Sequence, residues 1–273
     1  MTTTTFSPIA SADPYARIAD LDDATVAALA DRLELRGSDP RQHELWDAFL
    51  SRLPEEAGTR VLDVGCGTGI ITQKIALLPG VSEAVGVDPC PGFVERARRR
   101  APTLRFDVAD GRALPFPDHD FDGVVLATTL CHVPDPGRAL SEAHRVLRPG
   151  GFLLAYEGDY SAVTVALAPH DPLQCCVDAA VAGLVHDPWL VRRLAPLVRQ
   201  AGFATEALVG HGFLDADSPT YTPNLVDVGA DRLAAAGTIT AATVAALKAE
   251  ARARAAAGRY FGQIGYASLL ARS

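Results

Sequence analysis

The segment VLDVGCGTG, residues 61–69, limits the possible folds more than any other part of this 273-residue chain. Its apolar start predicts a buried strand, and the alternating glycines Gly65, Gly67 and Gly69 predict a tight turn into a helix. Glycine has no Cβ, so the backbone of such a turn can approach a bound ligand closely. Asp63 lies near the end of this strand. Its carboxylate can bind a cationic amino group and would repel a pyrophosphate. The segment therefore predicts a ligand site that differs from a phosphate-binding loop.

Acidic residues also follow the next two predicted strands. Asp88, with Pro89 after it, ends the second strand about 20 residues beyond the first glycine, where an acid can accept hydrogen bonds from ribose hydroxyls. Asp110, followed by Gly111, comes after the third strand, where a carboxylate can accept a hydrogen bond from an adenine amino group. An NAD-binding loop would need a third glycine in the pattern G-x-G-x-x-G, and Ile70 occupies that place. A dehydrogenase is therefore disfavoured.

Short apolar runs alternate with helical stretches from Arg60 onward. This alternation indicates βαβ units and a parallel sheet buried on both faces, so the expected fold class is α/β with helices on both faces of the sheet. The predicted strands are residues 60–64, 83–87, 103–108, 121–127, 151–156, 206–210 and 260–271. The predicted helices between the first five strands are residues 69–78, 92–100 and 137–146.

The beginning of the chain and two later segments depart from this alternation. Residues 1–57 are expected to form an N-terminal cover of two helices, with a loose tail over the first dozen residues. Residues 58–273 are expected to form the ligand-binding domain. Segment 158–187 is expected to be a loop and a helix over the sheet, and segment 217–257 a helical insertion. Both insertions are expected to cap the substrate.

The charge balance argues against nucleic acid as a partner. The formal net charge is −8, so no chain-wide basic surface is available to phosphate backbones. No apolar run reaches the roughly 18–20 residues that span a bilayer. The N-terminus lacks the basic start and apolar stretch of a signal peptide. We therefore expect a cytoplasmic protein with no membrane partner.

The cysteines favour the same compartment. Five cysteines without a C-x-x-C pair indicate reduced thiols rather than a disulfide framework or a zinc site. No group of His, Cys and acidic residues has metal-ligand spacing, and the acids at the strand ends have a simpler role as ligand contacts. No metal is therefore expected.

The runs VLDVGCGTG, VGVDP, DVADGRALPFPDHDFDGVV and LRPGGFLLAYEGD resemble the class I S-adenosylmethionine-dependent methyltransferases. More narrowly, they are similar to ubiquinone and menaquinone methyltransferases and to bacterial natural-product methyltransferases. The similarity covers about Arg60 to Glu157. It implies a Rossmann-like, mostly parallel seven-stranded sheet in the order 3-2-1-4-5-7-6, with the last strand antiparallel. It also implies S-adenosylmethionine as cofactor, S-adenosylhomocysteine as product, and methyl transfer to a small-molecule acceptor, which we place in natural-product biosynthesis.

The resemblance implies roles for individual residues. The acid and the glycines of the first segment would contact the methionine portion of the cofactor, the acid of the second strand the ribose, and the acid of the third strand the adenine. Thr128 would lie near the methionine end, and Tyr15 and Arg36 in the N-terminal cover would close over the cofactor. The cofactor-binding residues implied in this way are Tyr15, Arg36, Asp63, Gly65, Gly67, Gly69, Asp88, Pro89, Asp110, Gly111 and Thr128.

The catalytic residues are sought near the expected methyl group. Methyl transfer is an in-line displacement at a sulfonium carbon, so the protein must align the acceptor and, for a neutral hydroxyl, remove its proton. His132, just past the fourth strand, is the first candidate base. Asp159 and Tyr160, in the predicted loop after the fifth strand, could bind the acceptor or act as the base. Further candidates are Glu157, His170 and His186.

The acceptor pocket is expected between the N-terminal cover and the two insertions. Its candidate lining residues are Leu173, Val177, Leu184 and Trp189. An apolar lining of this kind suits an aromatic, quinone-like or polyketide-like acceptor.

Alternatives to methylation stay open. Proteins of this fold can use or keep the cofactor for a non-methylating reaction such as a cyclisation, and a pure binding role is the remaining possibility. The mass of the product separates these functions, because only transfer adds a methyl group. The sequence does not specify the acceptor, the accepting atom (oxygen, nitrogen or carbon), the need for a general base or the oligomeric state.

Overall fold

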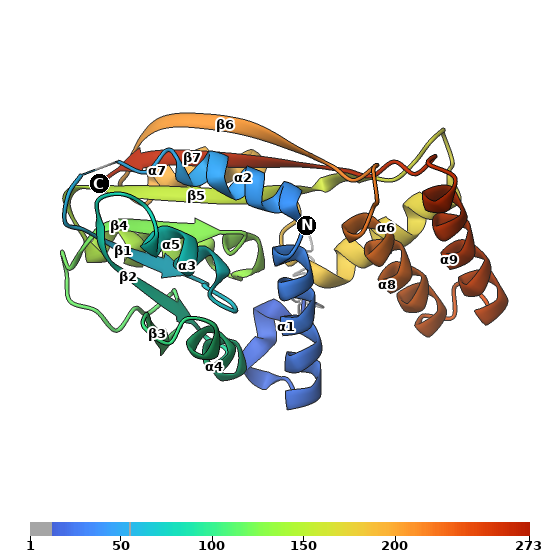
Figure 1. The fold of residues 1–273 in the computed structure, drawn as a ribbon, viewed down its shortest axis with the longest axis horizontal. Helices are drawn as coiled ribbons and strands as arrows, with labels where there is room; N and C mark the ends of the chain where they lie inside the picture. The colour runs from blue at the N-terminus through green and yellow to red at the C-terminus, as the bar shows by residue number, and fades with distance from the viewer. Residues whose placement is uncertain (1–12, 55) are drawn as a thin grey trace, which may run out of the picture.

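One sheet organises the chain. The computed structural model describes residues 13–54 and 56–273, and the predicted loose tail lies outside them. Within the described residues, seven strands form a sheet in the order β3-β2-β1-β4-β5-β7-β6 (Figure 1), which confirms the predicted α/β class and topology. The strands are β1 (Thr59–Val64), β2 (Val81–Asp88), β3 (Arg105–Val108), β4 (Phe121–Ala127), β5 (Leu147–Thr164), β6 (Ala204–Leu214) and β7 (Gln263–Arg272).

Helices cover both faces of this sheet. The α-helices are α1 (Asp23–Gly37), α2 (Pro40–Leu50), α3 (Ile70–Ala76), α4 (Pro91–Arg100), α5 (Pro136–Val146), α6 (Pro172–Leu184), α7 (Leu194–Gln200), α8 (Tyr221–Ala235) and α9 (Ala241–Ala256). Short 3-10 helices are η1 (Tyr15–Asp20), η2 (Leu130–His132) and η3 (Leu190–Arg193). In Figure 1, α2 crosses in front of β5 and β7, and α7 lies behind them.

Strand β1 lies at the centre of the parallel part of the sheet. It pairs in parallel with β2 on one side and with β4 on the other, and β5 continues the parallel pairing beyond β4. Strand β7 is antiparallel to both β5 and β6, as the resemblance implies. Because the strand order reverses at β1, the loops that leave β1 and β4 diverge and leave a crevice at their carboxyl ends.

Residues 158–164 belong to strand β5, where we predicted a loop, and that prediction was wrong. Strand β5 pairs antiparallel with β7 as far as Thr164 and Gln263. The hydrogen bonds that extend the strand come from this distant partner, so no local sequence signal marks them. Asp159 and Tyr160 are consecutive residues of the strand, and their side chains therefore point to opposite faces.

Helices α6, α8 and α9 form a lobe beyond the sheet, at the right of Figure 1. Helices α6 and α8 approach closely because Gly229 of α8 lies against the backbone of Cys176 in α6, where no Cβ would fit. Arg232 Nη2 donates a hydrogen bond to the Gly183 carbonyl at 2.5 Å, which ties the other end of the same contact. Helix α9 is tied to the start of α6 by the buried ion pair Arg254–Asp171 at 2.6 Å.

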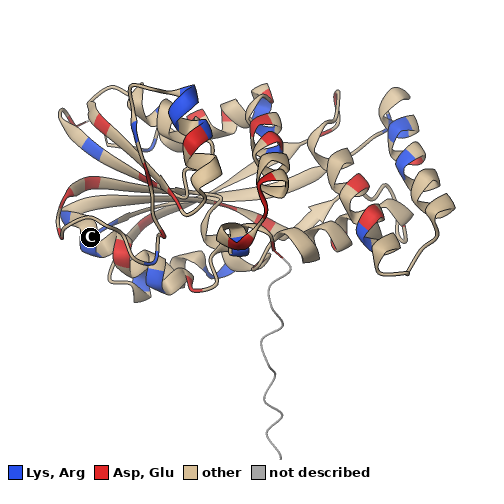
Figure 2. Ribbon diagram, turned by 90° about the horizontal axis from the view of Figure 1, so that it is seen from below, with Lys and Arg blue, Asp and Glu red and all other residues tan. Residues whose placement is uncertain are grey.

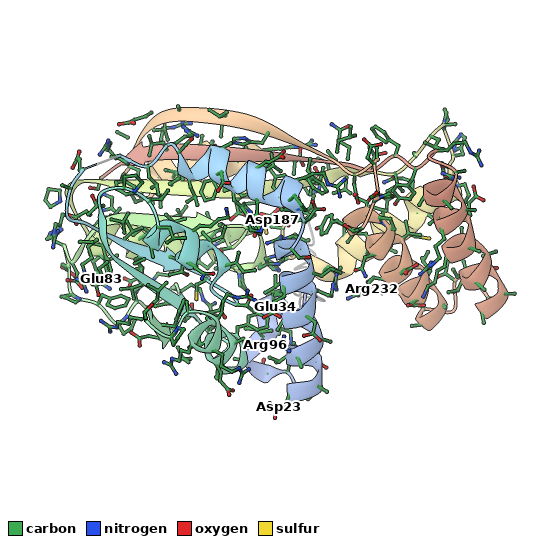
Figure 3. The ribbon with its side chains drawn as sticks, in the orientation of Figure 1. Asp23, Glu34, Glu83, Arg96, Asp187 and Arg232 are labelled. Atoms are coloured by element: carbon green, nitrogen blue, oxygen red, sulfur yellow. The ribbon has the colours of Figure 1, made fainter. Side chains whose placement is uncertain are left out.

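Helix α1 stands against α4 at the other side of the crevice. Arg96 of α4 pairs with Asp31 at 2.6 Å and with Glu34 at 3.3 Å, and Figure 3 shows Glu34 and Arg96 next to each other. Arg100 pairs with Glu34 at 3.0 Å as well. These pairs are partly exposed, so each contributes little stability, but together they fix the position of α1 relative to the sheet.

Substitution of Gly229 by alanine should destabilise the lobe. The new Cβ would overlap backbone atoms of Cys176, which cannot rotate away, and overpacking of this kind costs about 1–3 kcal/mol. We expect a lower midpoint in thermal denaturation followed by circular dichroism. Gly210→Ala is the control, because that position has open space around it. Equal midpoints for the two variants would contradict the close helix contact.

Candidate active site

A cavity of about 380 Å³ opens at the carboxyl ends of β1, β2 and β4. Its walls come from the sheet on one side and from η1, α1, α6 and α8 on the other. Most of the predicted site residues meet here. Those that line the cavity are Tyr15, Arg36, Asp63, Gly65, Gly67, Asp88, Pro89, Asp110, Gly111, Thr128, His132 and Tyr160. Gly69 and Asp159 do not line it.

The glycines that follow β1 have two different structural roles. Gly65 has a φ of +76°, and a Cβ there would overlap the Thr129 side chain, so the turn after β1 requires glycine. Gly69 has a φ of +83° and stands just before α3, outside the cavity. A Cβ at Gly69 would lie 2.9 Å from the Cβ of Ala97. The structure therefore gives Gly69 a role in starting α3 and packing it, in place of the ligand contact we predicted.

Asp63 is buried at the floor of the cavity. Its Oδ2 accepts a hydrogen bond from Thr72 Oγ1 at 2.6 Å. Burial raises the pKa of Asp63 to about 7, because a carboxylate with few partners is disfavoured away from water. Among the described residues, no cationic side chain forms an ion pair with it. A ligand with an ammonium group would supply the missing charge.

Asp88 is held rigidly by backbone donors. Its Oδ2 accepts from the Gly67 N–H and its Oδ1 from the Cys90 N–H, each at 2.9 Å. Burial raises the pKa of Asp88 to about 6. Each carboxylate oxygen keeps a further lone pair for a hydroxyl donor.

Asp110 is paired with a residue that the sequence analysis missed. Arg112 Nη2 lies 2.7 Å from Asp110 Oδ2, and the backbone N–H of Arg112 donates to Oδ1 at 2.8 Å. The hydrogen bonds from Arg112 lower the pKa of Asp110, so this acid is ionised and only partly available to a ligand. Arg112 also lines the cavity, and its place directly after Asp110 and Gly111 is the signal that could have found it.

Arg36 reaches the cavity from α1. Its Nη2 donates to Thr128 Oγ1 at 3.0 Å, while its Nε is buried and has no hydrogen-bond partner. Tyr15, Tyr160 and Tyr221 line the same cavity as the guanidinium, and within the described chain no carboxylate pairs with it. Thr128 has a φ of +52°, which is strained for a β-branched residue and typical of functional positions. The guanidinium is thus placed to receive an anionic group at the end of β4.

His132 is fixed by an aspartate from outside the predicted site. His132 Nδ1 lies 2.8 Å from Asp13 Oδ2, and the His132 ring lies against the Tyr15 ring with centroids 4.8 Å apart. Asp13 also accepts from the backbone N–H groups of Tyr15 at 2.9 Å and His186 at 2.8 Å. The sequence analysis missed Asp13 because it precedes the first helix and follows a polar tail.

One half of the cavity, here called the acceptor half, is lined by apolar side chains and tyrosines. Only one of the predicted lining residues belongs to it. Leu184 lines the cavity, whereas Leu173 and Val177 are buried in the core beside it. Trp189 is 53% exposed, with the Arg192 guanidinium 4.4 Å from its ring centroid, so its predicted role was wrong. The residues of this half are Tyr160, Val181, Leu184, Val185, Tyr221 and Leu225.

Four further candidates for acceptor binding or catalysis also lie outside the cavity. Asp159 pairs with Arg192 at 3.1 Å and accepts from Ser161 Oγ, on the strand face opposite Tyr160. Glu157 is fully buried, and its Oε1 accepts from the N–H groups of Thr129 and Leu130 at 2.9 and 2.7 Å. Burial raises the pKa of Glu157, so it supports the loop after β4 rather than acting in the cavity. The cavity is also not lined by His170 and His186.

Residues 13–54 and 56–273 show neither a metal-binding cluster nor a membrane-spanning helix. They contain no group of three or more His, Cys, Asp or Glu side chains placed to hold a metal ion. None of their helices has both the length and the apolar character needed to cross a bilayer.

Comparison with known proteins identifies relatives of this chain. A family described as "Methyltransferase domain" matches residues 62–155. The ubiquinone/menaquinone biosynthesis C-methyltransferase of Bordetella avium is 32% identical over 197 residues, which cover 70% of this chain and 72% of that protein. The 27-O-demethylrifamycin SV methyltransferase of Amycolatopsis mediterranei is 39% identical over 115 residues, 40% of this chain and 42% of that protein. The chain spans about half the length of several other curated relatives it matches.

Solved structures give the same fold. A structure described as the [4+2]-cyclase SpnF is 27% identical, with a TM-score of 0.54 over 85% of this chain and 81% of the other. An S-adenosylmethionine-dependent methyltransferase from Mesorhizobium loti is 22% identical, with a TM-score of 0.54 over 84% of this chain and 97% of the other. At that identity the second comparison supports the fold alone.

The buried Asp63 should make the unliganded chain less stable as the pH rises. Its pKa in the folded state is raised from 3.8 to about 7, so between these values the folded state binds more protons than the unfolded state. The contribution of Asp63 to the free energy of unfolding should therefore fall from about pH 4 to about pH 7, by about 1.4 kcal/mol or less per pH unit. Urea denaturation at several pH values measures it.

The matched variant for this experiment is Asp63→Asn, which keeps an acceptor for Thr72 but cannot ionise. Its free energy of unfolding should fall less over the same pH range. Parallel pH profiles for the wild type and the variant would contradict the raised pKa.

Proposed function

This chain belongs to the class I S-adenosylmethionine-dependent methyltransferases, and from that premise we propose that it methylates a hydroxyl group of a small acceptor whose skeleton is apolar or aromatic. The proposal that the accepting group is a hydroxyl rests on the Asp13–His132 pair at the cavity wall. The proposal that the skeleton of the acceptor is apolar or aromatic rests on the apolar and tyrosine side chains that line the cavity. We place the reaction in bacterial natural-product metabolism, for which the similarity to the rifamycin methyltransferase is support.

The proposed cofactor contacts follow from the charges in the cavity. Asp63 receives the ammonium group of the methionine portion, and Arg36 with Thr128 receives its carboxylate. Asp88 accepts from the ribose hydroxyls, while Asp110 and Gly111 border the adenine. The residues fit this molecule because Asp63 lacks a cation and Arg36 lacks an anion in the described chain. The cofactor supplies a methyl group bound to sulfonium, which is the electrophile.

His132 acts in this proposal as the general base. Its Nδ1–H donates to Asp13, which leaves Nε2 as the acceptor for the proton of the acceptor hydroxyl. Asp13 holds the ring in one tautomer and stabilises the imidazolium that forms. Tyr160 keeps its proton, because burial raises its pKa well above the usual range. We therefore assign Tyr160 to hydrogen bonding and orientation of the acceptor, in place of a base.

In the same proposal, the chain consists of an N-terminal cover and a catalytic domain. The N-terminal cover, of which the structure describes residues 13–54, 56 and 57, closes over the cofactor, and residues 58–273 form the domain that binds it. Insertions 158–187 and 217–257 supply the acceptor wall through α6 and α8, with the first beginning in strand β5.

We further propose that the enzyme works in the cytoplasm and does not act on nucleic acid. All five cysteines are free in the structure, which suits a reducing compartment. Figure 2 shows Lys and Arg interspersed with Asp and Glu along the ribbon, rather than gathered in one basic region.

A cyclisation without methyl transfer is the second candidate. The similarity to the [4+2]-cyclase SpnF over 85% of this chain favours it. In that case the product has the same mass as the substrate, whereas methylation adds one methyl group. Mass spectrometry of the product decides between the two.

S-adenosylhomocysteine should bind with micromolar-range affinity in calorimetry, and NAD should not bind. Affinity should fall as the pH drops below about 7, because Asp63 and Asp88, with pKa values of about 7 and 6, must be ionised to hold the ligand. The decrease should reach up to about tenfold per pH unit for each group that must lose a proton. Asp88→Ala should abolish binding, and the surface variant Asp107→Ala should not. Binding of NAD in its place would overturn the assignment.

Substitution of His132 by asparagine should lower kcat by about 10²–10⁴-fold and leave the affinity for S-adenosylhomocysteine unchanged. Asp13→Asn should lower kcat less and shift the pH profile, because the ring loses its orienting carboxylate. The assay follows methylated products by mass spectrometry in a library of hydroxylated aromatic and polyketide acceptors. His170→Asn is the control outside the cavity. Full activity of the His132 variant would remove the proposed base.

A further inference from the structure

A second, smaller cavity of about 30 Å³ adjoins the acceptor half of the main one. Arg32, Arg36 and Tyr221 line both cavities, so the two spaces are separated only by these side chains. The remaining walls of the small cavity come from α1, α2 and the start of α8. They are Leu35, Asp39, Gln42, Thr220 and Asn224.

Two buried donors at this small cavity lack acceptors. Among the described residues, the Nε of Arg36 and the Nε2 of Gln42 are inaccessible to solvent and have no hydrogen-bond partner, and the Gln42 amide lies near the Tyr266 hydroxyl, which also lacks one. Gln42 is only 1% exposed, so water outside the protein cannot satisfy it. A buried donor without an acceptor costs about 1–3 kcal/mol. An acceptor atom that a ligand places here would satisfy these donors.

The charges around the cavity favour an anion as that acceptor. Within the described chain, Arg32 has no ion pair, and Arg36 is bound only to the neutral hydroxyl of Thr128. Asp39, the acid that lines the cavity, already binds Arg41 at 2.6 Å. Arg41 in turn pairs with the fully buried Asp215 at 2.9 Å. The two acids thus serve Arg41. Because Arg36 is assigned to the carboxylate of the cofactor, Arg32 is the cation at this cavity that has no acidic partner among the described residues.

We infer that the small cavity is a recognition site for a compact oxyanion, and that this anion is a carboxylate carried by the acceptor. The inference rests on the proposed function, since it names the substrate class of the same site. The Arg36 Nη groups face Thr128 and the cofactor end, while its Nε and the Arg32 side chain serve the acceptor. The acceptor is then a hydroxylated carboxylic acid whose apolar body lies along Tyr221 and Leu225. The limited volume admits a compact group and excludes a large polar head.

The test uses the ¹⁵N-labelled full chain saturated with S-adenosylhomocysteine, at constant ionic strength in sodium chloride. Sodium benzoate and benzamide are the probes, and the side-chain amide signals of Gln42, assigned with Gln42→Leu, are the readout. We expect a saturable shift with benzoate and none with benzamide. Sodium acetate and inorganic phosphate tell a carboxylate site from a general anion site: acetate should compete with benzoate, and phosphate should not.

Two arginine variants make the result specific. Arg32→Gln should weaken benzoate binding about tenfold or more, as expected for loss of a charge-assisted hydrogen bond. Arg17→Gln should change it by less than about twofold, because Arg17 lines the main cavity but not the small one. Absence of a benzoate shift, an equal response to benzamide, or competition by phosphate (an adventitious ion only) would overturn the inference. Loss of S-adenosylhomocysteine binding would instead be a failure of the proposed function, and calorimetry measures it separately.

Discussion

The reversal of strand order at β1 is the constraint on which the rest of the site depends. Strands β2 and β4 lie on opposite sides of β1, so the connections that leave the carboxyl ends of β1 and β4 diverge and open a crevice there. The left-handed turn at Gly65 keeps the backbone close to the floor of that crevice. Asp63, Asp88 and Thr128 reach the same space because each belongs to, or directly follows, one of these strand ends.

In the described part of the chain, the buried carboxylate of Asp63 and the buried guanidinium of Arg36 have no side-chain partner of opposite charge. Such charges are unfavourable in an unliganded fold, because each loses its hydration without gaining a partner. A zwitterion with an ammonium group and a carboxylate satisfies Asp63 and Arg36 together. The methionine portion of S-adenosylmethionine is a zwitterion of this kind, and a neutral nucleoside would leave both residues unpaired. Selectivity for the cofactor and reduced stability of the free enzyme thus have the same physical origin.

The sequence predicted those parts of the structure that depend on local pattern. The glycine turn and the acids at the strand ends follow from short motifs, and the resemblance to the methyltransferases implied the strand order, which the structure confirms. Asp13 escaped prediction because its contact with His132 joins residues 119 positions apart. The sequence analysis predicted strand β5 too short, because the hydrogen bonds that extend it come from β7, about a hundred residues away. Trp189 was placed in a pocket on its apolar character alone, although it lies on the surface beneath Arg192.

Strand β5 has 18 residues and runs without interruption from the sheet into the lobe, a length of roughly 60 Å. Helix α6 follows its far end, α8 follows β6, and α9 precedes β7, so the whole lobe is attached to the half of the sheet that holds no cofactor acid. The lobe can therefore change its side chains, or even its helices, without disturbing Asp63 or Asp88. Within a lineage, acceptor preference can diversify rapidly while the distance between acceptor and methyl donor stays set by the backbone of two long strands.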